Sequence, residues 1–148
     1  MRATRIAAGA LLALAVAAGC AGGKSYPDRP EKNLRVLTSA TGTSVVMGVH
    51  RLDANCRAHY EGVVTLDAPL IEIGLPPDQM SLLVFEFYGF SLMSGSRAMK
   101  REARLLPRAG HRYEARVIYK DSIYSVGLVE IDARGTAREL DSGRAAGC

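Results

Sequence analysis

The amino-acid sequence predicts an all-β fold, a single seven- to nine-stranded antiparallel sandwich. Runs of β-branched and aromatic residues are separated, at near-regular spacing, by clusters of Gly, Pro, Asp, Asn and Ser. Several runs alternate apolar and polar residues with the period of two that a half-buried strand requires. No helical repeat and no alternation of strands with helices is present, so a sandwich or a barrel is the economical architecture.

The first half of the domain contains four segments with strand composition, each ended by a turn cluster. These segments are 45–52, 60–66, 70–75 and 80–88. The last is the most apolar stretch after the N-terminal region. Its two faces are both apolar, with Leu83, Phe85 and Phe87 on one, and Leu82, Val84 and Tyr88 on the other. This pattern predicts a central strand buried on both sides.

The second half begins with a Gly- and Ser-rich loop over 89–95 and ends in a hairpin. Residues 97–106 fit a short helix or a strand, and a strand is preferred because both neighbours are strands. Alternation is clearest in 112–119 and continues in 123–131 after a short turn, which predicts the hairpin. In its second strand, Ile123, Val129 and Ile131 are expected to point inward. A weak last strand over 136–140 and a tail over 141–148 follow.

The N-terminus has the pattern of a cleavable export signal. Arg2 and Arg5 precede an apolar run over 6–19 that contains no charge. As a helix the run is about 21 Å long, whereas a hydrocarbon core of about 30 Å needs about 20 apolar residues. The run therefore has the length of a signal-peptide core behind a positive segment rather than that of a membrane span.

The end of this run, Ala17-Ala18-Gly19-Cys20, resembles the lipobox of bacterial lipoproteins. Ala17 stands where Leu is most usual in that motif. The resemblance implies cleavage after residue 19 and attachment of diacylglyceryl to the sulfur of Cys20. Two or more acyl chains hold a protein stably on a bilayer without a transmembrane helix. An ordinary signal peptide is the alternative, and it also predicts export.

The chain after Cys20 is predicted to divide into three parts. Residues 20–33 are small, polar and Pro-rich, and are expected to form a flexible tether. Residues 34–140 are expected to form the sandwich, and 141–148 a frayed tail. Ala21 follows the modified cysteine where an inner-membrane retention signal would have Asp. By resemblance to lipoproteins of diderm bacteria, this favours the outer membrane, with the domain facing the periplasm.

Charge and cysteine content restrict the classes of partner. The formal net charge of the chain is +4, and half of it comes from Arg2 and Arg5 of the leader. No dense stripe of Lys and Arg remains to bind nucleic acid. With Cys20 assigned to the lipid, Cys56 and Cys148 form an even pair in an oxidising compartment. A disulfide between them, two free thiols and an intermolecular bridge are all compatible with the sequence.

Two segments resemble PEGA-like β modules of bacterial lipoproteins of unknown function. Residues 75–84, Leu-Pro-Pro-Asp-Gln-Met-Ser-Leu-Leu-Val, are similar to the turn that leads into a strand of that module. Residues 108–113, Arg-Ala-Gly-His-Arg-Tyr, are similar to its later strand. Asp78 replaces the usual turn glycine. The resemblance implies a seven-stranded, immunoglobulin-like sandwich and assigns no catalytic residue.

No motif in the sequence specifies catalysis or metal binding. The histidines are His50, His59 and His111, and Cys56 with His59 is half of a zinc-site pattern without a second half. No Ser lies in a nucleophile elbow. An enzyme would need two of these histidines and a carboxylate in one cleft. We expect no cofactor, no metal and no catalytic residue.

The candidate binding residues flank the Gly- and Ser-rich loop. Tyr88 and Phe90 could form an apolar lip, and together with Tyr119 they could line a pocket. The following stretch is basic and could contact an acidic partner or phosphorylated headgroups; its candidate residues are Arg97, Lys100, Arg101 and Arg104. The sequence thus favours a non-enzymatic envelope lipoprotein that binds another envelope component, such as a protein or a polysaccharide. A module for a small ligand or a polysaccharide is the alternative.

Overall fold

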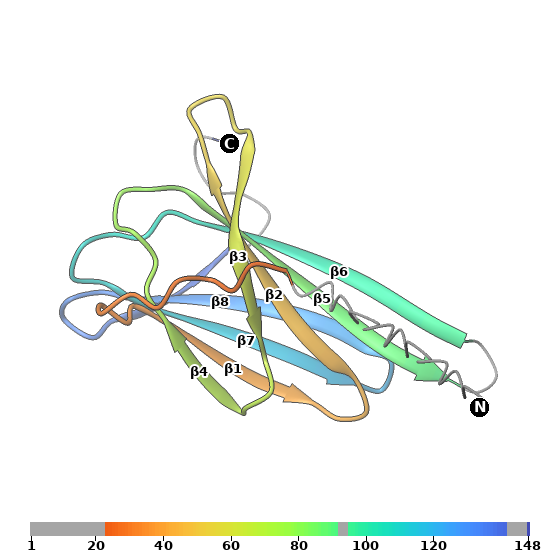
Figure 1. Cartoon of the computed structure of the whole chain (residues 1–148). Coiled ribbons are helices and arrows are strands. Elements are labelled where there is room, and N and C mark those ends of the chain that lie inside the picture. The colour runs from red at the N-terminus through yellow and green to blue at the C-terminus, as the bar shows by residue number, and fades with distance from the viewer. Residues whose placement is uncertain (1–22, 92–94, 142–147) are drawn as a thin grey trace, which may run out of the picture.

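The protein is a two-layer β-sandwich, which confirms the predicted fold class. The computed structural model describes residues 23–91, 95–141 and 148, and within these it contains nine strands and no helix (Figure 1). The predicted leader and Cys20 lie outside the described residues. The strands are β1 (Leu34–Ala40), β2 (Ser44–Leu52), β3 (Ala58–Thr65), β4 (Leu70–Ile73), β5 (Ser81–Ser91), β6 (Gly95–Leu105), β7 (Arg112–Lys120), β8 (Ile123–Ile131) and β9 (Ala137–Leu140).

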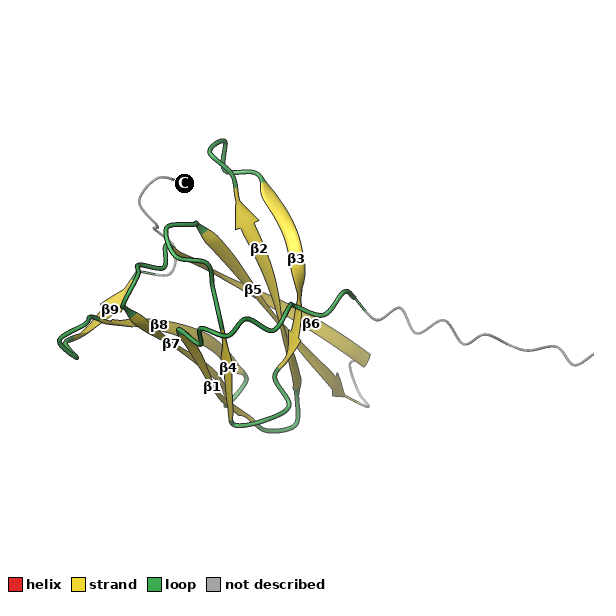
Figure 2. Ribbon diagram, turned by 60° about the vertical axis from the view of Figure 1, so that its left-hand side comes forward, coloured by secondary structure: helices red, strands yellow, loops and turns green. Residues whose placement is uncertain are grey.

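The strands form two sheets that lie face to face (Figure 2). One sheet has five strands in the order β4-β1-β7-β8-β9, and the other has four in the order β3-β2-β5-β6. Every pair of neighbouring strands is antiparallel except β1 and β7, which run parallel. This parallel pair differs from the purely antiparallel sandwich that the sequence predicted. The segment for which a helix or a strand was possible is strand β6.

Strand β1 has no counterpart among the segments predicted from the sequence. Its only fully buried side chains are those of Leu34 and Val36, since the following Thr38 and Ser39 interrupt the apolar alternation. It is nevertheless central to its sheet, because it pairs with β4 on one side and with β7 on the other. The backbone pairing on both edges, rather than side-chain composition, defines this strand.

The core lies between the two sheets and is made by alternate residues of the facing strands. Its largest fully buried side chains come from both layers: Met47, Leu83, Phe85, Phe87 and Leu105 from the four-stranded sheet, and Leu34, Val36, Tyr113, Val117 and Leu128 from the five-stranded sheet. The predicted inward face of 112–119 is confirmed, since Tyr113, Ala115 and Val117 are buried.

Strand β5 is central in its sheet but is buried on one face only. Phe85 and Phe87 are fully buried, whereas the alternate residues Leu82 and Val84 are half-buried and Tyr88 is exposed. The prediction of burial on both sides is therefore wrong. No element within the described residues covers the second face, which is consequently an apolar surface on the outside of the sandwich.

The inward face of strand β8 also differs from the prediction. Tyr119 pairs with Tyr124 across the β7–β8 hairpin, and the two residues between the strands, Asp121 and Ser122, both have positive φ. This is the type I′ turn that two-residue hairpins favour, and it sets the register. As a result Leu128 and Glu130 point inward and Ile123 is 67% exposed, whereas Val129, which was also predicted to point inward, is buried.

The segment predicted as a flexible tether is packed on the domain over its described part. Residues Lys24 and Tyr26 exchange backbone hydrogen bonds of 2.8 and 2.9 Å with Val63 of β3. The Tyr26 side chain is buried, and its hydroxyl donates to the Gly74 carbonyl at 2.8 Å. A Cβ atom on Gly62 would lie 2.5 Å from the Tyr26 backbone, so glycine permits this close approach.

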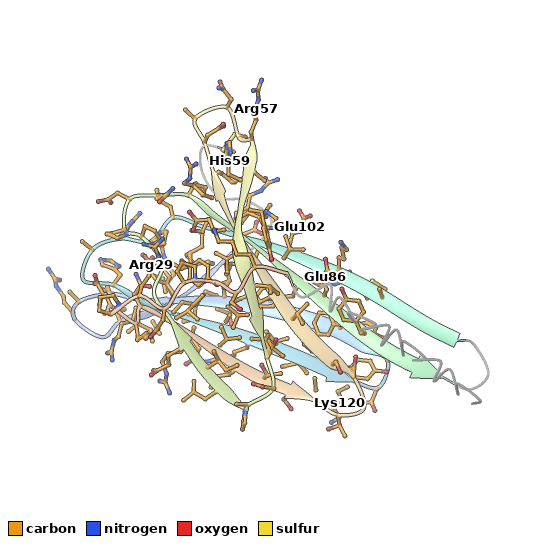
Figure 3. All side chains as sticks on the ribbon, in the orientation of Figure 1. Arg29, Arg57, His59, Glu86, Glu102 and Lys120 are labelled. Carbon is orange, nitrogen blue, oxygen red and sulfur yellow. A yellow bond between two sulfur atoms is a disulfide. The ribbon has the colours of Figure 1, made fainter. Side chains whose placement is uncertain are left out.

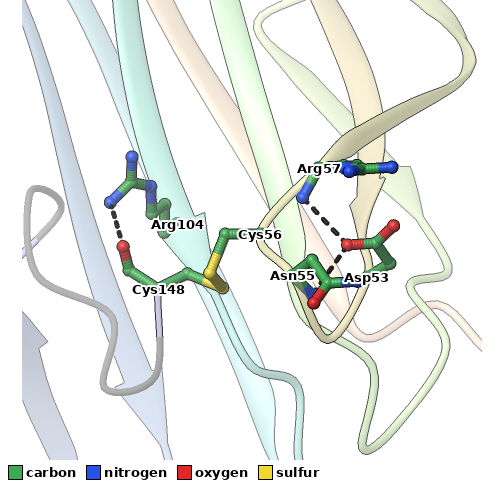
Figure 4. Close-up of a disulfide and its surroundings, with 6 residues drawn as sticks. All are labelled: Asp53, Asn55, Cys56, Arg57, Arg104 and Cys148. Atoms are coloured by element: carbon green, nitrogen blue, oxygen red, sulfur yellow. Dashed lines mark hydrogen bonds between the residues drawn. A yellow bond between two sulfur atoms is a disulfide. The ribbon is translucent and has the colours of Figure 1, made fainter.

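A disulfide joins Cys56 to Cys148, with their Cα atoms 5.5 Å apart (Figure 4). Of the three states that the sequence allowed for this pair, the structure has the intramolecular bridge. The bridge connects the turn between β2 and β3 to the C-terminal residue, and the Arg104 guanidinium donates to the Cys148 carbonyl at 3.0 Å. Within the described residues, no helix has the length and apolar character needed to cross a membrane.

Candidate binding groove on the outer face of the four-stranded sheet

The uncovered face of the four-stranded sheet contains a groove of about 920 Å³. Strand pairing brings the outward side chains of all four strands level with one another. On this face Gly48 of β2 lies between Val63 of β3 and Val84 of β5, and Val84 in turn pairs with Glu102 of β6. The groove is lined by Gly23, Ser25, Val46, Gly48, His50, Tyr60, Val63, Thr65, Leu82, Val84, Glu86, Tyr88, Lys100 and Glu102.

The floor of the groove is apolar and contains a glycine in the middle of a central strand. Val46, Val63, Leu82 and Val84 are half-buried and surround Gly48. A Cβ at Gly48 would approach only the His50 ring at 3.4 Å and the Val84 carbonyl at 3.8 Å, and the backbone there does not have positive φ. Neither backbone conformation nor close packing thus requires glycine. Such strand glycines often mark a place where a ligand approaches closely.

Charged side chains border the groove on β5 and β6, where Glu86 and Glu102 project from the sheet (Figure 3). The Lys100 ammonium contacts the Glu86 carboxylate at 2.7 Å, and the Tyr88 hydroxyl donates to the same carboxylate. These two hydrogen bonds, that from Lys100 first, hold the pKa of Glu86 below its usual range. The bond to Glu86 in turn raises the pKa of Tyr88. Glu86 is therefore an ionised acceptor.

The opposite border is made by β2, β3 and the packed N-terminal segment. The rings of His50 and Tyr60 meet edge to face, with centroids 5.3 Å apart. The Tyr60 hydroxyl donates to the Lys24 carbonyl at 3.3 Å, which fixes the tyrosine beside Gly23 and Ser25. The part of the chain predicted as a tether therefore supplies one wall of the groove. Sequence reasoning missed this wall because polar, Pro-rich composition gives no sign of packing.

The basic stretch predicted as a binding surface is divided between the two faces of β6. Lys100 borders the groove, whereas Arg101 pairs with Phe85 and so belongs to the opposite face, where its guanidinium donates to the Tyr124 carbonyl at 3.3 Å. Arg104 is on the outer face but contacts the C-terminal residue. The side chains of Phe90 and Arg97 lie outside the described part.

Of the predicted aromatic residues, only Tyr88 is described at the groove. Tyr119 stacks on Tyr124 with ring centroids 4.6 Å apart, and Tyr124 contacts Phe87 of the other sheet edge to face. Tyr119 is therefore part of the packing between the sheets rather than of a pocket with Tyr88. Tyr60, which sequence reasoning missed, takes that place at the groove because the register of β2 and β3 puts it opposite His50.

The three histidines lie in separate surroundings. His50 is in the groove, and His59 pairs with Asp53 at 2.9 Å in the turn region between β2 and β3. His111 contacts Glu130 at 3.0 Å in the other sheet. Among the described residues, no three His, Cys, Asp or Glu side chains are placed to share a metal ion. The structure thus does not bring two histidines together with a carboxylate.

A buried carboxylate in the five-stranded sheet was not foreseen. Glu130 is 6% exposed and accepts hydrogen bonds from Tyr113 at 3.1 Å and from Arg138 at 2.6 Å, beside His111. Burial raises the pKa of this carboxyl, but the bonds from Arg138 and Tyr113, the charge of Arg108 and the contact with His111 outweigh it and lower the pKa. This satisfied network anchors β9 to β8. The hairpin register, which puts Glu130 opposite Tyr113, could have indicated it.

Glu86 does not have the electrostatic surroundings of a general acid. A general acid at neutral pH needs a raised pKa, whereas Glu86 is held ionised by Lys100 and Tyr88. Comparison of the chain with protein-family models, with curated proteins and with solved structures finds no match. The resemblance to PEGA-like modules therefore remains a prediction.

Proposed function

We propose that this protein is a non-enzymatic, membrane-anchored component of the bacterial envelope. Cys20 carries the lipid, and the domain binds an envelope component in the groove of the four-stranded sheet. The observation that carries the binding role is the groove itself, with an apolar floor, ionised and aromatic borders and no covering element among the described residues. A sheet face that only had to be soluble would present polar side chains at the positions of Val46, Leu82 and Val84.

The disulfide supports the location that we propose. Structural disulfides persist in oxidising compartments such as the periplasm and are rare in the cytosol. The bridge between Cys56 and Cys148 is thus consistent with export by the predicted leader. The anchor, rather than a transmembrane helix, then accounts for attachment to the envelope, and the outer membrane is the site favoured by Ala21.

Envelope components should perturb the groove face selectively. In an NMR spectrum of the backbone amides of the Cys20→Ser form, addition of solubilised envelope components should shift the signals of Gly48 in β2 and of Val84 and Glu86 in β5. Signals of β1 and β8, in the other sheet, serve as the internal control. Shifts confined to the five-stranded sheet, or none at any concentration tested, would contradict a binding role for the groove.

Replacing Cys20 by serine should release the protein from the membrane. Without the acceptor sulfur no acyl chain is attached, and each buried CH₂ that is lost removes about 0.8 kcal/mol of membrane affinity. Cell fractionation should therefore find the wild type in the membrane fraction and the Cys20→Ser protein in the soluble fraction. Mass spectrometry of the native N-terminus provides the control. An unmodified Cys20, or a Cys20→Ser protein that stays on the membrane, would refute the anchor.

A further inference from the structure

We propose that the groove binds an envelope glycan whose sugars are uncharged or carry amino groups. This inference rests on the proposed binding role of the groove and names the chemical class of its ligand. It depends on three features of the lining: two exposed aromatic rings at its ends, an apolar floor ringed by hydrogen-bonding groups, and an excess of negative charge.

The two exposed tyrosines mark the ends of an elongated site. Tyr60 is 47% exposed and Tyr88 is 44% exposed. His50 pairs with Tyr60 on one side and with Leu82 on the other, so Tyr60 and Leu82 lie at the same height along the sheet. From Tyr60, the rise per residue between Leu82 and Tyr88 and the spacing of two strand pairs therefore put Tyr88 about 20 Å along the strands and about 10 Å across them. The diagonal of about 22 Å accommodates several linked sugars. A compact small molecule could not contact both rings.

Each tyrosine ring is held in place before a ligand arrives. The hydroxyl of Tyr60 is bonded to the Lys24 carbonyl, and the hydroxyl of Tyr88 to the Glu86 carboxylate. Both rings are nevertheless partly exposed, although one side of the Tyr60 ring packs against His50. An ordered aromatic surface costs little conformational entropy on binding. It can pack against the C–H face of a sugar ring as a rigid apolar plate.

The floor and its surroundings match the two kinds of surface that a sugar presents. Val46, Val63 and Val84 can pack against C–H groups, and the open space above Gly48 lets a ring approach the sheet. Hydroxyl groups need donors and acceptors at the edge of that patch, and the edge has them in His50, Thr65, Glu86, Lys100 and Glu102. A fatty acyl chain would remove water from the charged groups of Glu86, Lys100 and Glu102 without offering them a hydrogen bond, which disfavours it.

The sign of the charge restricts the sugar. Lys100 is neutralised by Glu86 at 2.7 Å. Glu102 is exposed and forms no direct hydrogen bond or salt bridge with a side chain that the structure describes, although its charge also acts on Lys100. The residues that line the groove therefore include one more carboxylate than ammonium group, and Arg104, on the same face of β6, is directed to the carbonyl of Cys148. An anionic sugar would be repelled, whereas hydroxyl or amino groups can donate to Glu102.

The decisive experiment is calorimetric titration of the full mature chain, in its Cys20→Ser form, with three hexasaccharides. One is built of neutral N-acetylated amino sugars, the second is its deacetylated, cationic form, and the third is built of uronic acids. We expect the first two to bind and the third not to bind. Tyr60→Ala and Tyr88→Ala should each weaken binding about threefold to tenfold, by loss of aromatic contact. Ile118→Ala, which truncates an exposed apolar residue of the other sheet, is the matched control.

Charge selection is tested separately with Glu102→Gln. This variant should lower the preference for the deacetylated over the acetylated hexasaccharide about twofold to fivefold, as expected for one exposed charge. Binding of the uronic-acid hexasaccharide, unchanged binding by both tyrosine variants, or binding of none of the sugars would overturn the glycan assignment. If no sugar binds but envelope components still shift Gly48 and Val84, the ligand class is wrong while the binding role stands.

Discussion

Replacing Cys56 by serine is expected to lower the free energy of unfolding by about 4–5 kcal/mol. The bridge to Cys148 closes a loop with a sequence separation of 92 residues, and the entropy removed from the unfolded chain grows with the length of the closed loop. The bridge also fixes the end of the chain to the turn between β2 and β3. Urea denaturation of the oxidised wild type and of the variant, followed by circular dichroism, measures the difference.

The controls for this prediction use the same bond. Cys148→Ser and the Cys56→Ser/Cys148→Ser double variant should lose the same free energy, because either substitution abolishes the single cross-link. Wild type unfolded in the presence of a reducing agent should match them. A loss below about 1 kcal/mol in all of these would mean that the bridge contributes little beyond the fold.

Replacing Phe85 by alanine is expected to cost about 3–5 kcal/mol. The ring is fully buried on the inner face of β5, directly opposite Met47 of β2 in the strand register. Its removal leaves a cavity between the two sheets that neighbouring strands cannot close without disturbing their pairing. The midpoint of urea denaturation should fall, while the slope of the free energy of unfolding against urea concentration stays unchanged.

Val84→Ala is the matched control, because Val84 immediately precedes Phe85 on the same strand and points into the groove. Its half-exposed side chain should contribute about 1 kcal/mol or less. The pair of variants thus measures which face of β5 is core. Equal, large losses at both positions would show that the outer face is covered in the native protein, as the apolar sequence alone suggested.

Most of the strands could be predicted from the sequence because alternation and turn residues act locally. The alternation of Tyr113, Ala115 and Val117 identified a strand and its buried face correctly, and β6 was correctly preferred as a strand. Apolar composition alone could not identify the open face of β5. Residues such as Leu82 and Val84 look the same in sequence whether they are covered by another layer or line a groove.

The features that sequence reasoning missed depend on pairing between distant segments. Strand β1 exists because β4 and β7 pair with its two edges, and its own composition is weak. The inward position of Glu130 follows from the two-residue turn at Asp121 and Ser122, which shifts the face of β8 relative to the apolar pattern. The groove itself combines four strands with the packed N-terminal segment, so no local motif marks it.

The attachment of Lys24 and Tyr26 to β3 has a consequence for the reach of the domain. With Cys20 as the anchor, only the few residues up to Gly23 separate the lipid from the body of the protein, a distance of at most about 11 Å when fully extended. Such a short connection would keep the sandwich beside the lipid headgroups and restrict its rotation. The protein would therefore bind only ligands that come close to the bilayer surface, and could not reach ligands farther across the compartment.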